Sequence, residues 1–169
     1  MKILVTIDCD FAGYDPLYGH TCALDEPQFH ADLCRTRDLV REETGTGGLC
    51  FIHTSPFMRR HHHDLFYTDD KYLAFWREHC QAGGQVGLHP HEDEPDGSAY
   101  YYYYPDHMRA VLVRALGRLH AAGLTTDSVR CGYCAGNERL FGVLDELNLR
   151  FLHDNMGGDW PEVYVFWSN

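Results

Sequence analysis

Near its start the sequence reads "KILVTIDCDFAG" (Lys2–Gly13), in which an apolar run meets two acids. The five apolar or β-branched residues from Ile3 to Ile7 predict a buried strand, and Asp8 and Asp10 follow at once. Carboxylates at the end of such a strand are unfavourable unless a cation or a hydrogen-bond donor pairs with them. If the strand continues, both acids point to one face, with Cα atoms about 6–7 Å apart. They could hold one metal ion or flank one substrate atom, and a helix cap or loop-closing pair is the structural alternative.

Apolar runs and helical patterns alternate along the rest of the chain, after a polar segment up to Leu24 that we expect to be a loop. This alternation predicts an α/β fold of parallel βα units, either a barrel or a doubly wound sheet. A length of 169 residues fits one domain, residues 1–169. The expected strands are 3–8, 49–53, 85–89, 129–130, 150–154 and 162–167, and the expected helices are 27–43, 70–82, 105–122 and 138–147.

Composition excludes several classes of partner. The formal net charge of −11 repels phosphate backbones, so we expect no nucleic-acid partner. No apolar run approaches the 18 residues of a membrane span, and the apolar start is too short for a secretory signal. Seven scattered cysteines, an odd number, fit a reducing compartment. These features predict a cytoplasmic protein, and they leave its oligomeric state unknown.

A second group of candidate residues is "GLHPHEDE" (Gly87–Glu94), at the end of the third expected strand. His89 and His91 carry imidazoles, the commonest protein ligands of zinc-like ions, and Asp93 is the central member of the acidic run beside them. This combination predicts a metal site. The run His61–His63 follows two arginines in a polar segment, which favours a solvated loop.

A third group is "RCGYCAGN" (Arg130–Asn137). The guanidinium of Arg130 can hold a carboxylate in a fixed fork, so we expect Arg130 to orient Asp8, with an ordinary surface ion pair as the alternative. Cys131 and Cys134 also form a C-x-x-C pattern, which could be redox-active or half of a zinc site.

In their order along the chain, these three groups resemble the motifs of the NodB-homology polysaccharide deacetylases, a carbohydrate esterase family. "TIDCD" is similar to the first motif, "GLHPHED" to the second, and "RCGYCAGNERLFGVLDELNLRFLHDN" to the third with its following helix and strand. The resemblance covers residues 3–155. It implies a distorted (β/α) barrel and a metal-dependent hydrolase that removes an N-acetyl group from a sugar or glycan.

The resemblance also implies a role for each matching residue. Asp8 would be the catalytic base, and Asp10, His89 and His91 would bind one divalent ion, with Zn²⁺ as the expected metal and Co²⁺, Ni²⁺ and Mg²⁺ as alternatives. Asp93 stands where the usual spacing would put the second histidine, so either His91 or Asp93 completes the set.

Four further residues are assigned to catalysis or substrate binding. The backbone N–H of Tyr133 would meet the developing oxyanion. His153, the last histidine in the sequence, would protonate the leaving amine, and Tyr104 and Trp160 would face the acetylated sugar.

The sequence departs from the family pattern in several places. Cys9 separates the two acids, and the late Leu-x-His motif that carries the family's general acid is absent. The 169 residues are also fewer than the ~250 of an eight-unit barrel, so we expect a barrel that is shortened or incomplete at its C-terminal end.

Two other functions fit parts of the sequence. "ILVTIDCDFAG" also resembles the opening of haloacid-dehalogenase-type phosphatases, with Asp8 as nucleophile and Asp10 as acid and base. Such chemistry needs a positive side chain against the phosphate, but the chain has only two lysines, Lys2 and Lys71. Alternatively, the absent acid motif fits a degenerate module that binds a metal or a sugar without turnover.

Overall fold

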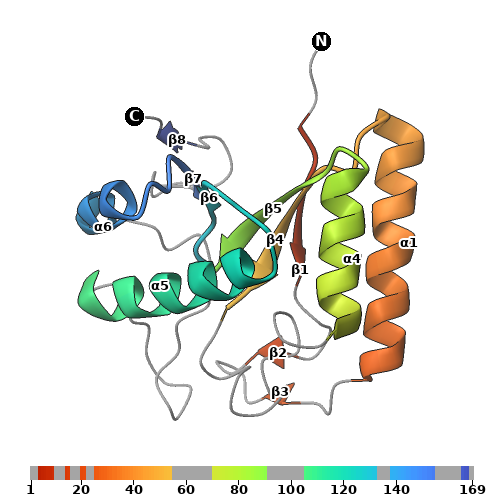
Figure 1. Cartoon of the computed structure of the whole chain (residues 1–169), viewed down its shortest axis with the longest axis horizontal. Helices are drawn as coiled ribbons and strands as arrows, with labels where there is room; N and C mark the ends of the chain where they lie inside the picture. The colour runs from red at the N-terminus through yellow and green to blue at the C-terminus, as the bar shows by residue number, and fades with distance from the viewer. Residues whose placement is uncertain are drawn as a thin grey trace.

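The computed structural model describes residues 4–9, 14–15, 20–21, 25–54, 70–90, 105–132, 138–154 and 165–167. Their main feature is a six-stranded sheet whose strands follow the order β1-β4-β5-β6-β7-β8 (Figure 1). The first five of these strands are parallel, and β8 is antiparallel to β7. The strands are β1 (Thr6–Cys9), β4 (Leu49–His53), β5 (Gln85–His89), β6 (Ser128–Val129), β7 (Phe151–Asp154) and β8 (Val165–Trp167).

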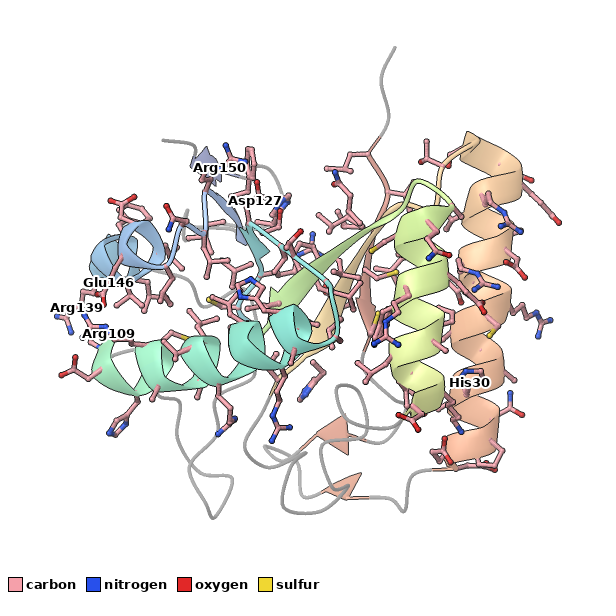
Figure 2. The ribbon with its side chains drawn as sticks, viewed as in Figure 1. His30, Arg109, Asp127, Arg139, Glu146 and Arg150 are labelled. Carbon is pink, nitrogen blue, oxygen red and sulfur yellow. The ribbon has the colours of Figure 1, made fainter. Side chains whose placement is uncertain are left out.

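Helices connect the parallel strands, which makes this an α/β fold. They are α1 (Glu26–Thr44), α4 (Asp70–Gln81), α5 (Pro105–Ala121) and α6 (Phe141–Glu146), and α1 and α4 lie side by side (Figure 1). The carboxylate of Asp25 caps α1 by accepting a hydrogen bond from the N–H of Gln28, and Gly45 ends the helix at a φ of 74°. Arg109 of α5 and Glu146 of α6 form an ion pair of 2.7 Å that joins these two helices (Figure 2).

One face of the sheet packs against all four of these helices. A single apolar cluster joins this face to residues such as Phe29 of α1, Trp76 of α4, Leu112 of α5 and Leu144 of α6. Because side chains alternate along a strand, the residues between those of the cluster point to the opposite face. The strand residues in the cluster include Cys9, Cys50, Ile52, Val86, Leu88, Val129 and Leu152.

The sheet curls toward the face that the helices leave open. β1 and β6 are three strand spacings apart, which is about 14 Å in a flat sheet. Arg130 nevertheless follows β6 and donates a hydrogen bond of 2.8 Å to Asp8 in β1. The open face is therefore concave. Among the described residues, β8 does not pair with β1, directly or through a further strand, so this part of the sheet does not close into a barrel.

Most predicted elements lie within a few residues of their expected positions, and three differ. The expected loop before Leu24 contains a short antiparallel pair, β2 (Tyr14–Asp15) and β3 (His20–Thr21). The expected helix 138–147 is a 3₁₀ turn, Glu138–Leu140, followed by the short α6. The last apolar run returns antiparallel as β8 instead of adding a parallel strand.

The described helices also bear on the expectation of no membrane span. Among the residues described, none of the helices combines the length and the apolar character that crossing a bilayer requires.

Candidate functional site

Arg130 lies at the centre of the concave face, at the end where the parallel strands finish. Its Nη1 donates to Oδ1 of Asp8 at 2.8 Å, and its Nη2 donates to Oγ1 of Thr6 at 2.8 Å. Its Nε donates to the carbonyl oxygen of His153 at 3.1 Å, and the guanidinium lies 4.5 Å above the ring of Phe51. One side chain thus ties together β1, β4 and β7, and the predicted contact between Arg130 and Asp8 is present.

The geometry of this ion pair differs from that of an ordinary surface pair. Only 14% of the Arg130 side chain is exposed, against 38% for Asp8. All three nitrogens of the guanidinium have an acceptor, so the fork cannot rotate without breaking several hydrogen bonds. The carboxylate of Asp8 is consequently held in one orientation while part of it stays open to solvent.

The second and third sequence groups run side by side where their strands end. The N–H of Arg130 donates to the carbonyl of Leu88 at 2.9 Å, and the N–H of Gly132 donates to the carbonyl of Pro90 at 2.9 Å. The two motifs therefore leave the sheet together, next to each other at the same edge. This is the edge where parallel βα folds place their sites.

His89 is buried, and its tautomer is set by the same arginine. Its Nδ1 lies 2.8 Å from the carbonyl oxygen of Arg130, and a carbonyl oxygen can only accept. We therefore assign the proton to Nδ1, so the lone pair of the neutral ring is on Nε2. Metal-binding histidines usually show this arrangement, in which a carbonyl or carboxylate fixes the second ring nitrogen.

His53 is a candidate that sequence reasoning missed. It ends β4 in direct register with His89 at the end of β5, and both side chains are buried. The two ring centroids are 5.9 Å apart, with an interplanar angle of 77°. The available signal was its position as the last residue of the run "LCFIH", at the same strand end as His89.

His153 is buried on the same face, and its ring meets that of Phe51 edge to face at 5.1 Å. Burial lowers the pKa of His153, the positive charge of Arg130 lowers it further, and Asp127 opposes both. The lowered pKa favours the neutral form of the imidazole. The general-acid role that the sequence predicted for His153 needs the protonated ring and stays a prediction.

The remaining predicted site residues lie outside the described residues. They are Asp10, His91, Asp93, Tyr104, Tyr133 and Trp160. Cys134 of the C-x-x-C pattern also lies outside, whereas Cys131 is described and buried. Among the described residues, no group of three or more histidines, cysteines and acids is placed to hold a metal ion.

The described part of the site thus consists of a fixed carboxylate, an arginine that fixes it, and two buried imidazoles at adjacent strand ends. Such a set can accept a proton from water and supply nitrogen ligands to a cation. In comparisons with known proteins, no family model, curated protein or solved structure matches this chain.

Proposed function

We propose that this chain is a metal-dependent carbohydrate N-deacetylase on a distorted (β/α) barrel, the function that its NodB-like motifs imply. The observation that carries the proposal is the hydrogen-bond network of Arg130, which links Asp8 and His89 across a curled sheet. Asp8, His89 and Arg130 come from the first, second and third of the sequence motifs, respectively. Their direct connection supports a common site, because Arg130 reaches Asp8 although β6 and β1 are three strand spacings apart in the sheet.

One described residue, His89, suits a divalent cation, and the other ligands of the proposed set lie outside the described residues. His89 offers Nε2 because its Nδ1 donates to the Arg130 carbonyl, and this is how protein zinc ligands are usually fixed. His89, Asp10 and His91 would hold the ion, with Asp93 as the alternative to His91 and His53 as a further nitrogen donor at the adjacent strand end. When bound, the ion would polarise the acetyl carbonyl and lower the pKa of water.

The chain's own residues would carry the proton. Asp8 would accept a proton from the attacking water, and Arg130 would keep the carboxylate aimed at that water. The N–H of Tyr133 would donate to the oxyanion that forms on the acetyl group. Because burial and the charge of Arg130 lower the pKa of His153, we propose that Asp8 returns its proton to the leaving amine. His153 would then act as a positioning residue through the carbonyl that holds Arg130.

The strand order weighs against the phosphatase alternative. A doubly wound sheet has helices on both faces and a reversal in strand order, where its site lies. Here the parallel strands follow one another in sequence, β1 is at the sheet edge, and the described helices pack on one face. This arrangement is typical of a barrel whose helices form an outer layer.

The lowered pKa of His153 favours one second candidate, a module that binds a metal or a sugar without turnover. Such a module would keep the ligands but lack an effective proton donor for the amine. It differs from the deacetylase in turnover and not in metal binding, so the two are separable by experiment.

The test is acetate release from a chitooligosaccharide by the purified chain, first with a chelator and then with added Zn²⁺, Co²⁺, Ni²⁺ or Mg²⁺. We expect metal-dependent release at less than about 1 per second, below an ordinary enzyme rate, since the family's acid motif is absent. Hydrolysis of p-nitrophenyl phosphate is measured in parallel.

Each outcome distinguishes the candidates. Metal binding without acetate release from any N-acetylated sugar would support the non-catalytic module. Metal-dependent phosphate hydrolysis without acetate release would support the phosphatase. Failure to bind any of the metals would contradict both the deacetylase and the metal-binding module.

A further inference from the structure

A row of three residues crosses the concave face of the sheet just before the strands end. Asp8 in β1 is in register with Phe51 in β4, and Phe51 is in register with Gly87 in β5. We call these three residues the Phe51 row. Two residues further along β4 and β5, His53 and His89 point to the same face, one step closer to the strand ends. The Phe51 row therefore lies immediately beneath the two buried imidazoles of the candidate site.

Gly87 leaves the space that the Phe51 ring occupies. A Cβ built on Gly87 would come within 2.6 Å of both Cδ1 and Cε1 of that ring, closer than non-bonded carbon atoms approach. It would also come within 3.2 Å of the carbonyl oxygen of Ser128. The φ of Gly87 lies outside the left-handed region, so its backbone conformation does not require a glycine. Gly87 is needed instead for the close approach of the ring to the backbone of β5.

The Phe51 ring in turn supports the guanidinium of Arg130. The side chain of Phe51 is fully buried, and the Cζ atom of Arg130 lies 4.5 Å from the centroid of its ring. A cation over an aromatic face is attracted to it at this distance. This attraction uses none of the N–H groups with which Arg130 binds Asp8, Thr6 and the His153 carbonyl. The ring thus restrains the guanidinium independently of its hydrogen bonds.

Phe51 also packs against the residue whose backbone holds Arg130. Its ring meets the imidazole of His153 edge to face, with centroids 5.1 Å apart and an interplanar angle of 65°. The carbonyl oxygen of His153 accepts the hydrogen bond from Nε of Arg130 at 3.1 Å. A displacement of the Phe51 ring would therefore disturb both the guanidinium and one of its three acceptors.

A second arginine that lies over a phenylalanine provides a contrast. The Cζ atom of Arg150 is 5.7 Å from the centroid of the Phe151 ring, against 4.5 Å for the pair of Arg130 and Phe51. The Arg150 side chain is 60% exposed, and that of Arg130 is 14% exposed. The attraction between a cation and a ring is weaker where water solvates the cation. Phe151 is therefore the matched control for substitutions at Phe51.

We propose that Phe51 is a positioning residue of the candidate site and that Gly87 is required to leave room for its ring. The ring holds Arg130 and, through Arg130, the carboxylate of Asp8. A base that loses its alignment with the attacking water slows the chemical step more than it weakens substrate binding. This kinetic consequence rests on the proposed deacetylase function, whereas the fixed position of Arg130 does not and is measured separately.

The first experiment measures hydrogen exchange at the arginine Nε–H groups of the whole chain by NMR at about pH 6. The Nε–H of Arg130 donates to a carbonyl oxygen in a mostly buried side chain, so it should exchange at least about tenfold more slowly than that of Arg150. Phe51→Leu should raise the exchange rate at Arg130 by at least about fivefold, whereas Phe151→Leu should leave it within about twofold. Equal exchange at the two arginines of the parent chain, or unchanged exchange in Phe51→Leu, would overturn the proposal.

A set of four variants tests the space that Gly87 provides. Gly87→Ala should lower the urea midpoint of unfolding, because the added Cβ collides with a buried ring. Combined with Phe51→Leu, the same substitution should lower the midpoint by less than half as much, since directly packed residues are not additive. Gly117→Ala on α5, where a Cβ would meet nothing within 4 Å, should not lower the midpoint of either protein. The same loss with and without Phe51→Leu, including failure of both Gly87→Ala proteins to fold, would remove Gly87 from the account.

A kinetic measurement separates positioning from substrate binding. In acetate release from a chitooligosaccharide, Phe51→Leu should lower kcat by about tenfold and change KM by less than about twofold, because the base is misaligned and not removed. Phe151→Leu should leave both constants within about twofold. A raised KM with an unchanged kcat would place Phe51 in substrate binding and overturn its positioning role. If the parent chain releases no acetate, the deacetylase proposal fails, and the exchange measurement alone decides whether Phe51 positions Arg130.

Discussion

Two arginine–aspartate pairs lie at opposite ends of the same part of the sheet. Arg130, directly after β6, binds Asp8. Arg150, directly before β7, binds Asp127, which precedes β6, and Figure 2 labels this second pair. The Arg150 side chain is 60% exposed, and that of Arg130 is 14% exposed. The residue types are the same, but Arg130 also holds Thr6 and a backbone carbonyl and sits above an aromatic ring.

This difference in burial and in hydrogen bonding explains why only the Arg130–Asp8 pair belongs to the candidate site. At the N-terminal end of the strands, the Arg150–Asp127 pair is a solvent-exposed ion pair between neighbouring segments. Such pairs contribute ~0–1 kcal/mol to the free energy of unfolding. At the C-terminal end, the Arg130–Asp8 pair spans a curled sheet and adjoins two buried imidazoles. The Arg150–Asp127 pair is therefore the matched control for substitutions at the Arg130–Asp8 pair.

The largest expected effect follows from Asp8→Asn. The amide cannot accept a proton from water, so the rate of acetate release should fall by roughly 10²–10⁴, the range for a lost general base. Asp127→Asn makes the same chemical change at the other strand end and should leave the rate within about twofold. Steady-state acetate assays on both variants provide the comparison, and a similar loss in both would refute the division between the two ends.

The next effect concerns stability. Arg130→Lys replaces a three-nitrogen fork by a single ammonium, which cannot bond Asp8, Thr6 and the His153 carbonyl at once. We expect the free energy of unfolding to fall by about 1–3 kcal/mol, because partly buried acceptors lose their donors. Arg150→Lys should change it by less than about 0.5 kcal/mol.

Urea denaturation of these two variants measures the free energy of unfolding directly. Equal losses in the Arg130 and Arg150 variants would contradict the distinction between the two pairs.

A smaller effect is expected at His53, the residue that sequence reasoning missed. As a nitrogen donor beside His89, it should contribute to cation binding, so His53→Ala should weaken Zn²⁺ affinity by about tenfold. His120, exposed on α5 and away from the strand ends, provides the matched control in His120→Ala. Competition titrations with a chromogenic chelator would report both affinities, and no change in His53→Ala would make His53 a structural residue.

The smallest effect is a pH dependence at His153. Its pKa is lowered, first by burial and then by the charge of Arg130, so the unfolded chain binds its proton more readily. The stability that the neutral ring contributes is present above its ordinary pKa near 6.5 and is lost as pH falls below it. His153→Gln should therefore lose less unfolding free energy than the parent chain between pH 7.5 and 5.5, by up to about 1 kcal/mol.

Urea denaturation at those two pH values provides the measurement. An equal or greater loss in His153→Gln would mean that His153 carries no such lowered pKa.

The elements that sequence reasoning located are those encoded by local periodicity. The runs 49–53 and 85–89 match β4 and β5, and the expected helix 27–43 lies within α1 (Glu26–Thr44). The contact between Arg130 and Asp8 was also predicted, because an arginine and a carboxylate at the ends of two strands were expected to pair.

What sequence reasoning missed depends on contacts between distant segments. The curl of the sheet, which lets Arg130 reach β1, arises from packing across several strands and leaves no local pattern. His53 was read as the end of an apolar run, and its importance emerges only when β4 and β5 pair in register. The lowered pKa of His153 likewise requires the burial and the neighbouring charge that folding creates.

The most direct test of the central claim is a zinc titration of the parent chain, Asp8→Asn, His89→Ala and the control His120→Ala, followed by isothermal calorimetry. If the strand ends form a metal-dependent hydrolytic site with divided roles, the parent, Asp8→Asn and His120→Ala should each bind one equivalent with similar affinity. His89→Ala should bind at least about tenfold more weakly. The same affinity in all four proteins, or a loss in Asp8→Asn with none in His89→Ala, would contradict the account.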